Sequence, residues 1–231
     1  MVDVLDIVKQ EVEKLLGGEK SGHDSAHSFR VYQMAVKFAR AEGADEEIVA
    51  LAALLHDVDD YKLFGQEGAD GLLNARKIMA RAEVPSAKQA QVCEIINSMG
   101  YSKSLVGIRP KTIEGKVVSD ADMLEGMGAT VIVRCLAFFA NERGVFDRNV
   151  WPNLDISAGE YKKIDRKSNN FINHFFEKLL RLKGMMLTGS GKAEAAGRHD
   201  FMVAFLRQFF VEQDADEWSR FLEDFLSSVE K

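Results

Sequence analysis

Two histidines and a few aspartates stand out because each lies on, or directly after, an apolar helical stripe. His27 precedes Val31 by four residues and Phe38 by eleven, so it shares the face that these side chains bury in a helix. His56 ends a second apolar stripe, and Asp57 follows it directly. A single histidine on such a face is more often a core residue than a metal ligand.

Two imidazoles together with two carboxylates need another explanation. Carboxylates buried in an apolar bundle are destabilising unless they are paired or bound to a cation. A divalent metal ion offsets this cost, and histidine with carboxylate is a suitable mixed ligand set. The second carboxylate belongs to Asp120 or Asp122. These residues are about 200° apart on a helix, so both cannot face one site unless the helix is broken there.

Three segments, taken in order, resemble the H…HD…D motif of the HD superfamily of metal-dependent phosphohydrolases. They are His27-Ser28-Phe29-Arg30-Val31, Leu54-Leu55-His56-Asp57-Val58 and Ser119-Asp120-Ala121-Asp122-Met123-Leu124. Two later segments, 173–180 and 198–202, are similar to the C-terminal half of a small bacterial and archaeal family of HD hydrolases. The likeness spans about residues 20–212.

This resemblance implies one divalent metal ion, with Mn²⁺ favoured and Mg²⁺, Ni²⁺, Co²⁺ or Fe²⁺ as alternatives. The ligands that it implies are His27, His56, Asp57 and Asp122. Asp120 is then left to support the site or to cap a helix. The family usually has Asp-Ala-Asp-Arg-Leu-Asp here, whereas this chain has methionine at 123 and glutamate at 125. The departure concerns the substrate more than the metal.

The implied reaction is attack of a metal-activated water on a phosphate ester or anhydride. The candidate catalytic residues are Asp57, Asp60 and Lys62, and the candidate substrate contacts are Arg30, Lys62 and His23. Asp59 shares the candidate role of Asp60, to orient or deprotonate the water. Apart from Asp57, each of these residues has a plainer alternative: His23 as a helix-start residue, and the others as solvated surface charges.

Three classes of function compete. The first is hydrolysis of a nucleotide, for example of a nucleoside triphosphate to the monophosphate and pyrophosphate. The second is a non-catalytic HD module that senses a nucleotide; the presence of all four ligand types argues against it. The third is an oxygenase on a related helical fold. It would need a two-iron site with more histidines, and the chain has five in all.

Composition limits the partners. The formal net charge of −6 argues against a general nucleic-acid binder. No stretch approaches the roughly 20 apolar residues of a membrane span, and the first residues lack the pattern of a signal peptide. We therefore expect a cytoplasmic protein with a small phosphorylated substrate. Cys93 and Cys135 are expected to be buried thiols.

The apolar periodicity predicts an all-α fold, and the resemblance implies an HD-type helical bundle with C-terminal helices packed on or beside it. We expect a single domain over 1–231, with a metal-binding core at about 20–142 and a C-terminal part at about 157–231. The expected helices are 2–16, 23–43, 46–56, 69–82, 86–98, 112–142 with a bend near 126–128, 158–182 and 192–230. Asp45 is the candidate N-cap of the helix at 46–56. Loops are expected at 61–67, 100–111 and 143–157, with a flexible connector at 184–191. The aromatic-rich last helix could also support a homodimer.

Overall fold

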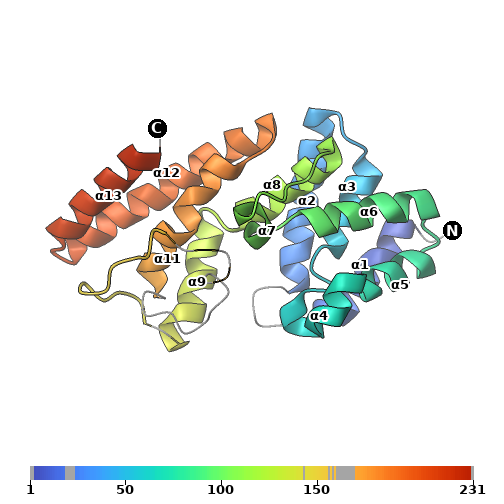
Figure 1. Cartoon of the computed structure of the whole chain (residues 1–231), viewed down its shortest axis with the longest axis horizontal. Helices are drawn as coiled ribbons and strands as arrows, with labels where there is room; N and C mark the ends of the chain where they lie inside the picture. Colours follow the sequence, from blue (N-terminus) through green and yellow to red (C-terminus); the bar gives the residue numbers. More distant parts are fainter. Residues whose placement is uncertain are drawn as a thin grey trace. The chain divides into compact units, whose positions relative to one another are not determined.

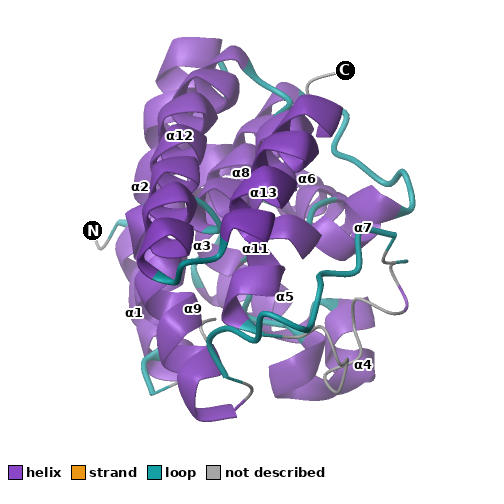
Figure 2. Cartoon of the chain, turned by 90° about the vertical axis from the view of Figure 1, so that its left-hand side faces the viewer, coloured by secondary structure: helices purple, strands orange, loops and turns teal. Residues whose placement is uncertain are grey.

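A computed structural model describes residues 3–18, 24–142, 144–155, 157, 159 and 170–229, without the side chains of residues 62, 140–142 and 229. Every regular element in these ranges is helical (Figure 2), which confirms the all-α prediction. No helix within the described ranges is both long and apolar enough to cross a membrane.

The chain divides into two compact units, and each is described here by itself (Figure 1). Unit 1 comprises Met1–Asp122 and Leu187–Ser190, and unit 2 comprises Met123–Met186 and Gly191–Lys231. The chain therefore leaves unit 1 directly after Asp122 and returns to it briefly at 187–190. The expectation of a single domain over 1–231 stays a prediction.

Unit 1 is built around a short, fully buried helix. Its helices are α1 (Val4–Leu16), α2 (Ser25–Glu42), α3 (Glu46–Leu55), α4 (Tyr61–Gly71), α5 (Leu73–Arg81), α6 (Ser86–Ser98), α7 (Tyr101–Leu105) and most of α8 (Ile113–Glu125). Helix α3 packs against α1, α2 and α6, and all its residues from Ile48 to Leu55 are buried. Asp45 caps it, as predicted, by accepting hydrogen bonds from the backbone N–H groups of Glu47 and Ile48.

Two loop predictions in unit 1 were wrong. Residues 61–67 belong to α4, and the helix is interrupted at Gly65, whose φ of 76° is left-handed. A short helix, α7, also forms inside the expected loop 100–111. The predicted bend after α8 is confirmed, because α9 starts only at Ala129, after Gly128 with a φ of 83°.

Unit 2 contains α9 (Ala129–Glu142), α11 (Phe171–Glu177), a 3₁₀ helix η1 (Leu179–Met185), α12 (Gly189–Glu212, which begins in unit 1) and α13 (Asp216–Val229). The single helix predicted over 192–230 was wrong. This segment forms the end of α12 and the whole of α13, which lie side by side (Figure 1). The chain reverses between them at Asp214, whose φ of 49° is left-handed. Residues 160–169 of the predicted helix 158–182 lie outside the described ranges.

Aromatic rings form the core of unit 2. Phe176, Phe210 and Trp218 are fully buried, and the rings of Phe210 and Trp218 lie 5.7 Å apart. Trp151 is 44% exposed, but one of its faces stacks on Trp218 at 4.4 Å. Most aromatic residues of the predicted last helix thus pack inside unit 2.

The two cysteines differ in burial. Cys93 is buried, as predicted, whereas Cys135 is only partly buried, and both are free thiols. Burial raises the pKa of each thiol above its ordinary value.

Candidate metal centre

Helix α2 presents the first candidate ligand at its N-terminal end. His27 is the third residue of α2, and Asp24 caps the helix by accepting a hydrogen bond of 2.7 Å from the His27 backbone N–H. His27 is 5% exposed and shares the buried face of α2 with Val31 and Phe38, as the spacing predicted. The cap therefore fixes both the start of the helix and the depth of the imidazole.

The C-terminal end of α3 carries the next two candidate ligands, His56 and Asp57. His56 is the C-cap of α3, and its Nδ1 lies 2.8 Å from the Ala53 carbonyl oxygen. A carbonyl only accepts, so Nδ1 carries the proton, and the Nε2 lone pair of the neutral ring faces the cluster. Asp57 follows in the turn and is 7% exposed. The end of one buried helix thus supplies an imidazole and a carboxylate.

Helix α8 contributes the fourth group, because one of its two aspartates lies near both histidines. Asp122 Oδ1 lies 3.5 Å from His27 Nε2 and 3.6 Å from His56 Nε2. Asp120 is fully buried and accepts hydrogen bonds from the backbone of Leu187 and Thr188 instead. The two carboxylates point to different partners, as their positions on the helix require.

The four side chains converge on a small volume. The Nε2 atoms of His27 and His56 are 3.2 Å apart. Asp57 Oδ2 lies 3.4 Å from the first and 3.3 Å from the second. Donor atoms bound about 2.1 Å from one octahedral ion are roughly 3 Å apart when adjacent. The cluster therefore needs to contract only slightly to hold a divalent ion.

The electrostatics of the cluster favour a positive charge. Burial lowers the pKa of His56, but the carboxylates of Asp57 and Asp122 outweigh it and raise that pKa well above its ordinary value. Burial raises the pKa of Asp122, but hydrogen bonds to His27 and His56 outweigh it and lower that pKa. A cation held among these groups would neutralise the same carboxylate charge.

Asp59 lies two residues after Asp57 in the sequence, but its carboxylate has different hydrogen-bond partners. It is 4% exposed, and its two oxygens accept hydrogen bonds of 2.8 Å from the backbone N–H groups of Asn74 and Ala75. It caps α5, and Asn74 donates in turn to the Val58 carbonyl. Both Asp59 oxygens thus accept from backbone donors, and the candidate role of Asp59 toward a water stays a prediction.

The structure describes the other candidate catalytic and substrate-binding residues less completely. Arg30 is half-buried on α2, one turn after His27, and Asp60 is half-buried just before α4. Lys62 lies in α4, but its side chain is outside the described part of the structure, as is the whole of His23. Their roles stay predictions. Residues 187–188, which hold Asp120, were missed because they fell in an expected flexible connector.

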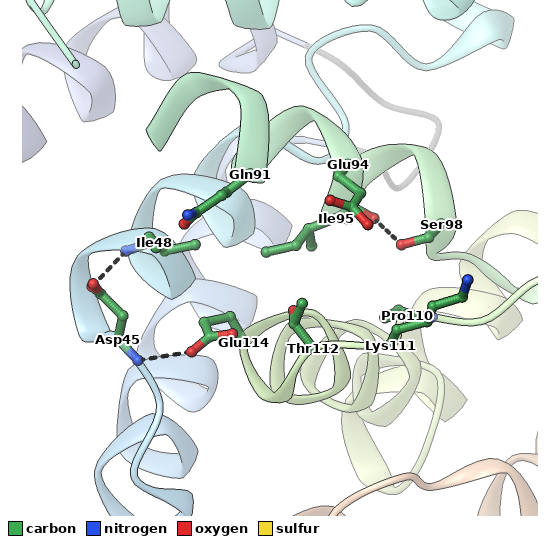
Figure 3. A pocket seen from close by; sticks show the side chains of 10 residues that line it. All are labelled: Asp45, Ile48, Gln91, Glu94, Ile95, Ser98, Pro110, Lys111, Thr112 and Glu114. Atoms are coloured by element: carbon green, nitrogen blue, oxygen red, sulfur yellow. Dashed lines mark hydrogen bonds between the residues drawn. The ribbon is translucent and has the colours of Figure 1, made fainter. Parts of the chain in front are cut away.

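A cavity of about 420 Å³ in unit 1 lies apart from the cluster, and Figure 3 shows it between α6 and the start of α8. Its lining residues are Asp45, Ile48, Gln91, Glu94, Ile95, Ser98, Pro110, Lys111, Thr112 and Glu114. None of the four cluster residues contributes to it. The side chains that line this cavity, Ser98 among them, therefore face a different space from the two histidines.

The fold and the cluster define an all-helical protein with a His–Asp site suited to a divalent ion. A family model described as HD domain matches residues 25–127. YpgQ of Bacillus subtilis is 35% identical over 206 residues, which cover 87% of this chain and 89% of YpgQ. The chain therefore belongs to the HD superfamily.

Comparison with solved structures supports this family membership. A Lactobacillus plantarum protein matches with a TM-score of 0.77 at 31% identity, covering 91% of this chain and 97% of that one. An HD-superfamily hydrolase from Bacillus thuringiensis matches at 0.69 and 32%, with the same coverage. YpgQ in complex with ADP matches at 0.64 and 31%, covering 90% and 97%. These relationships support a hydrolase whose His–Asp cluster could hold a divalent metal.

Proposed function

We propose that the protein is a phosphohydrolase that uses one divalent metal ion to cleave a phosphoester or phosphoanhydride bond, most plausibly in a nucleotide. The observation that carries the proposal is the convergence of His27, His56, Asp57 and Asp122, with donor atoms 3.2–3.6 Å apart. Two imidazoles and two carboxylates in this volume are a chemically reasonable set for a six-coordinate ion that keeps open positions.

We propose Mn²⁺ as the ion, with Mg²⁺, Ni²⁺, Co²⁺ or Fe²⁺ as alternatives, because a mixed nitrogen and oxygen set accepts all of them. When bound, the ion supplies a Lewis acid that makes a water more acidic and neutralises phosphate charge. The protein contributes the orientation: the Ala53 carbonyl holds the His56 ring with Nε2 toward the cluster.

Further residues are proposed for the phosphate and the water. Arg30, one turn from His27, is proposed to bind phosphate oxygens, with Lys62 and His23 as additional contacts. Asp57 and Asp60 are proposed to orient the attacking water or accept its proton, and Lys62 to offset charge on the phosphate. Cations around the phosphate are what such a transfer requires, because negative charge spreads over its oxygens.

The nucleotide is suggested by the ADP in the structure of YpgQ. For a nucleoside triphosphate, water would add to the α-phosphorus and the bond to the bridging oxygen would break. The products are the monophosphate and pyrophosphate, with release of a proton. Cytoplasmic location and a small phosphorylated substrate are consistent with this reaction and are part of the proposal.

The test combines metal analysis with a product screen. Purified protein, loaded with Mn²⁺, is offered nucleoside mono-, di- and triphosphates and a generic phosphoester, and phosphate and pyrophosphate are measured. We expect stoichiometric metal and one released product. The matched control is His199→Asn, which removes another buried imidazole, in unit 2. Loss of activity in His56→Ala but not in His199→Asn supports the proposal; equal activity in His56→Ala contradicts it.

A nucleotide-sensing module without catalysis is the second candidate, since a bound ADP in a relative can mark binding as well as turnover. Calorimetry with ADP and a triphosphate separates the two. Binding without any product, unaffected by His56→Ala, would favour the sensor.

A further inference from the structure

Asp120 is the buried carboxylate next to the cluster that the proposed reaction does not use. It is 0% exposed. Its oxygens accept hydrogen bonds from the backbone N–H of Leu187 at 2.9 Å, from the backbone N–H of Thr188 at 2.8 Å and from the Thr188 hydroxyl at 2.7 Å. All three donors come from the short segment 187–190, which belongs to unit 1. A buried carboxylate is thus fully engaged by a segment distant in sequence.

The position of Asp120 on α8 gives this contact a second effect. Asp122 is two residues further along, about 200° around the helix. When the 187–188 backbone holds one side of α8 through Asp120, it also sets the rotation of the opposite side. That side carries Asp122, whose Oδ1 lies 3.5 and 3.6 Å from the two imidazoles.

The same segment also holds the helix that carries His27. Glu42, at the last position of α2, accepts a hydrogen bond of 2.6 Å from the Ser190 backbone N–H. Residues 187–190 therefore contact α8 through Asp120 and α2 through Glu42. These are two of the three helices that supply the cluster.

We propose that Asp120 is a positioning residue, which with Thr188 locks the rotation of α8 so that Asp122 faces the two imidazoles. The inference rests on the proposed function, because it assigns Asp122 to the metal. Supporting groups of this kind typically change metal affinity about 10- to 100-fold when they are removed.

The experiment measures Mn²⁺ affinity, by electron paramagnetic resonance of free Mn²⁺, and the visible spectrum of the Co²⁺-loaded protein. Asp120→Asn keeps one acceptor oxygen and places an amide NH₂ where the other accepted hydrogen bonds, so the contact is weakened with little change in size. We expect about 10- to 100-fold weaker Mn²⁺ binding and a changed Co²⁺ spectrum. Thr188→Val, a milder variant that removes only the hydroxyl, should weaken binding severalfold, and Thr188→Ser should restore it.

The matched control is Asp45→Asn. Asp45 also caps backbone N–H groups, but it lies at the other end of α3 from His56, about 15 Å away. It should lower the unfolding midpoint and leave Mn²⁺ affinity and the Co²⁺ spectrum unchanged.

The outcomes distinguish a failure of the positioning role of Asp120 from a failure of the proposed function. If wild-type protein binds Mn²⁺ and Asp120→Asn binds it equally, with the wild-type Co²⁺ spectrum, Asp120 is merely structural and the inference is overturned. If Thr188→Val and Thr188→Ser behave alike, the inference also fails. If the wild-type protein binds no divalent ion, the proposed function falls, and the positioning role with it.

Discussion

Unit 1 and unit 2 both bury polar side chains, but they satisfy them differently. In unit 2, Asn170 caps α11 and Glu177 accepts a hydrogen bond from the Asn153 backbone N–H. In unit 1, Asp59 and Asp120 likewise accept from backbone donors. In the cluster, by contrast, two imidazoles and two carboxylates face one another. Several titratable side chains that converge on one point therefore indicate chemistry, whereas a carboxylate held by backbone donors indicates architecture.

The largest expected effect comes from the cluster itself. Asp57→Ala should lower the rate of phosphate hydrolysis about a thousandfold, corresponding to about 4 kcal/mol of transition-state stabilisation. Steady-state kinetics with saturating Mn²⁺ measure this, and circular dichroism checks that the helices persist. A folded variant that keeps near wild-type rates would remove the distinction between the cluster and the other buried polar groups.

The aromatic core of unit 2 should respond in the opposite way. Trp218→Ala removes a fully buried ring and should lower the free energy of unfolding by about 3–5 kcal/mol. The Mn²⁺ affinity of the folded variant should not change, since the cluster lies in unit 1. Urea titration and metal binding measured at low temperature test both parts. A large loss of metal affinity would show that the comparison between units is too simple.

Removal of the metal tests whether the ion stabilises the folded protein through the cluster in unit 1. At a Mn²⁺ concentration about 100 times its Kd, binding should stabilise the folded protein by about 2.7 kcal/mol. A chelator should lower the unfolding temperature accordingly, as followed by calorimetry. In His56→Ala the chelator should have no effect, and a persistent shift there would indicate that the ion binds elsewhere.

The smallest effect is expected from the neighbour of the cluster, Asp59. Asp59→Ala removes the cap of α5 and should cost about 1–2 kcal/mol of stability. Mn²⁺ affinity should fall far less than in Asp57→Ala, although the two residues are only two positions apart. Parallel chemical denaturation and metal titration of both variants decide this, and similar metal affinities would contradict the separate roles.

Much of the helical framework could be predicted from the sequence. The helix at 86–98 was predicted with the bounds that the structure gives, and Asp45 was identified as an N-cap. Both are local signals, apolar periodicity and a capping residue, that act within a few residues. Predictions failed at Gly65 and Asp214, where the chain adopts left-handed backbone conformations. Around Gly65 the expected loop is a helix with one left-handed residue, and at Asp214 helical periodicity on both sides concealed the turn.

The cluster could be predicted in part for the same reason. His27 and His56 lie on apolar stripes, and the motif resemblance selected Asp122. The partners of Asp120 could not be predicted, because they lie 67 and 68 residues away in a segment without periodicity. Whether a buried carboxylate meets a backbone donor or an imidazole depends on tertiary packing, which spacing alone does not determine.

The stacked pair Trp151 and Trp218 has a practical consequence for all these measurements. They are the two tryptophans of the chain, and both belong to unit 2, with ring planes 4° from parallel. Intrinsic tryptophan fluorescence therefore reports the melting of one unit. Unfolding curves recorded by this signal and by far-ultraviolet circular dichroism, which averages over every helix, should coincide only if the two units unfold together.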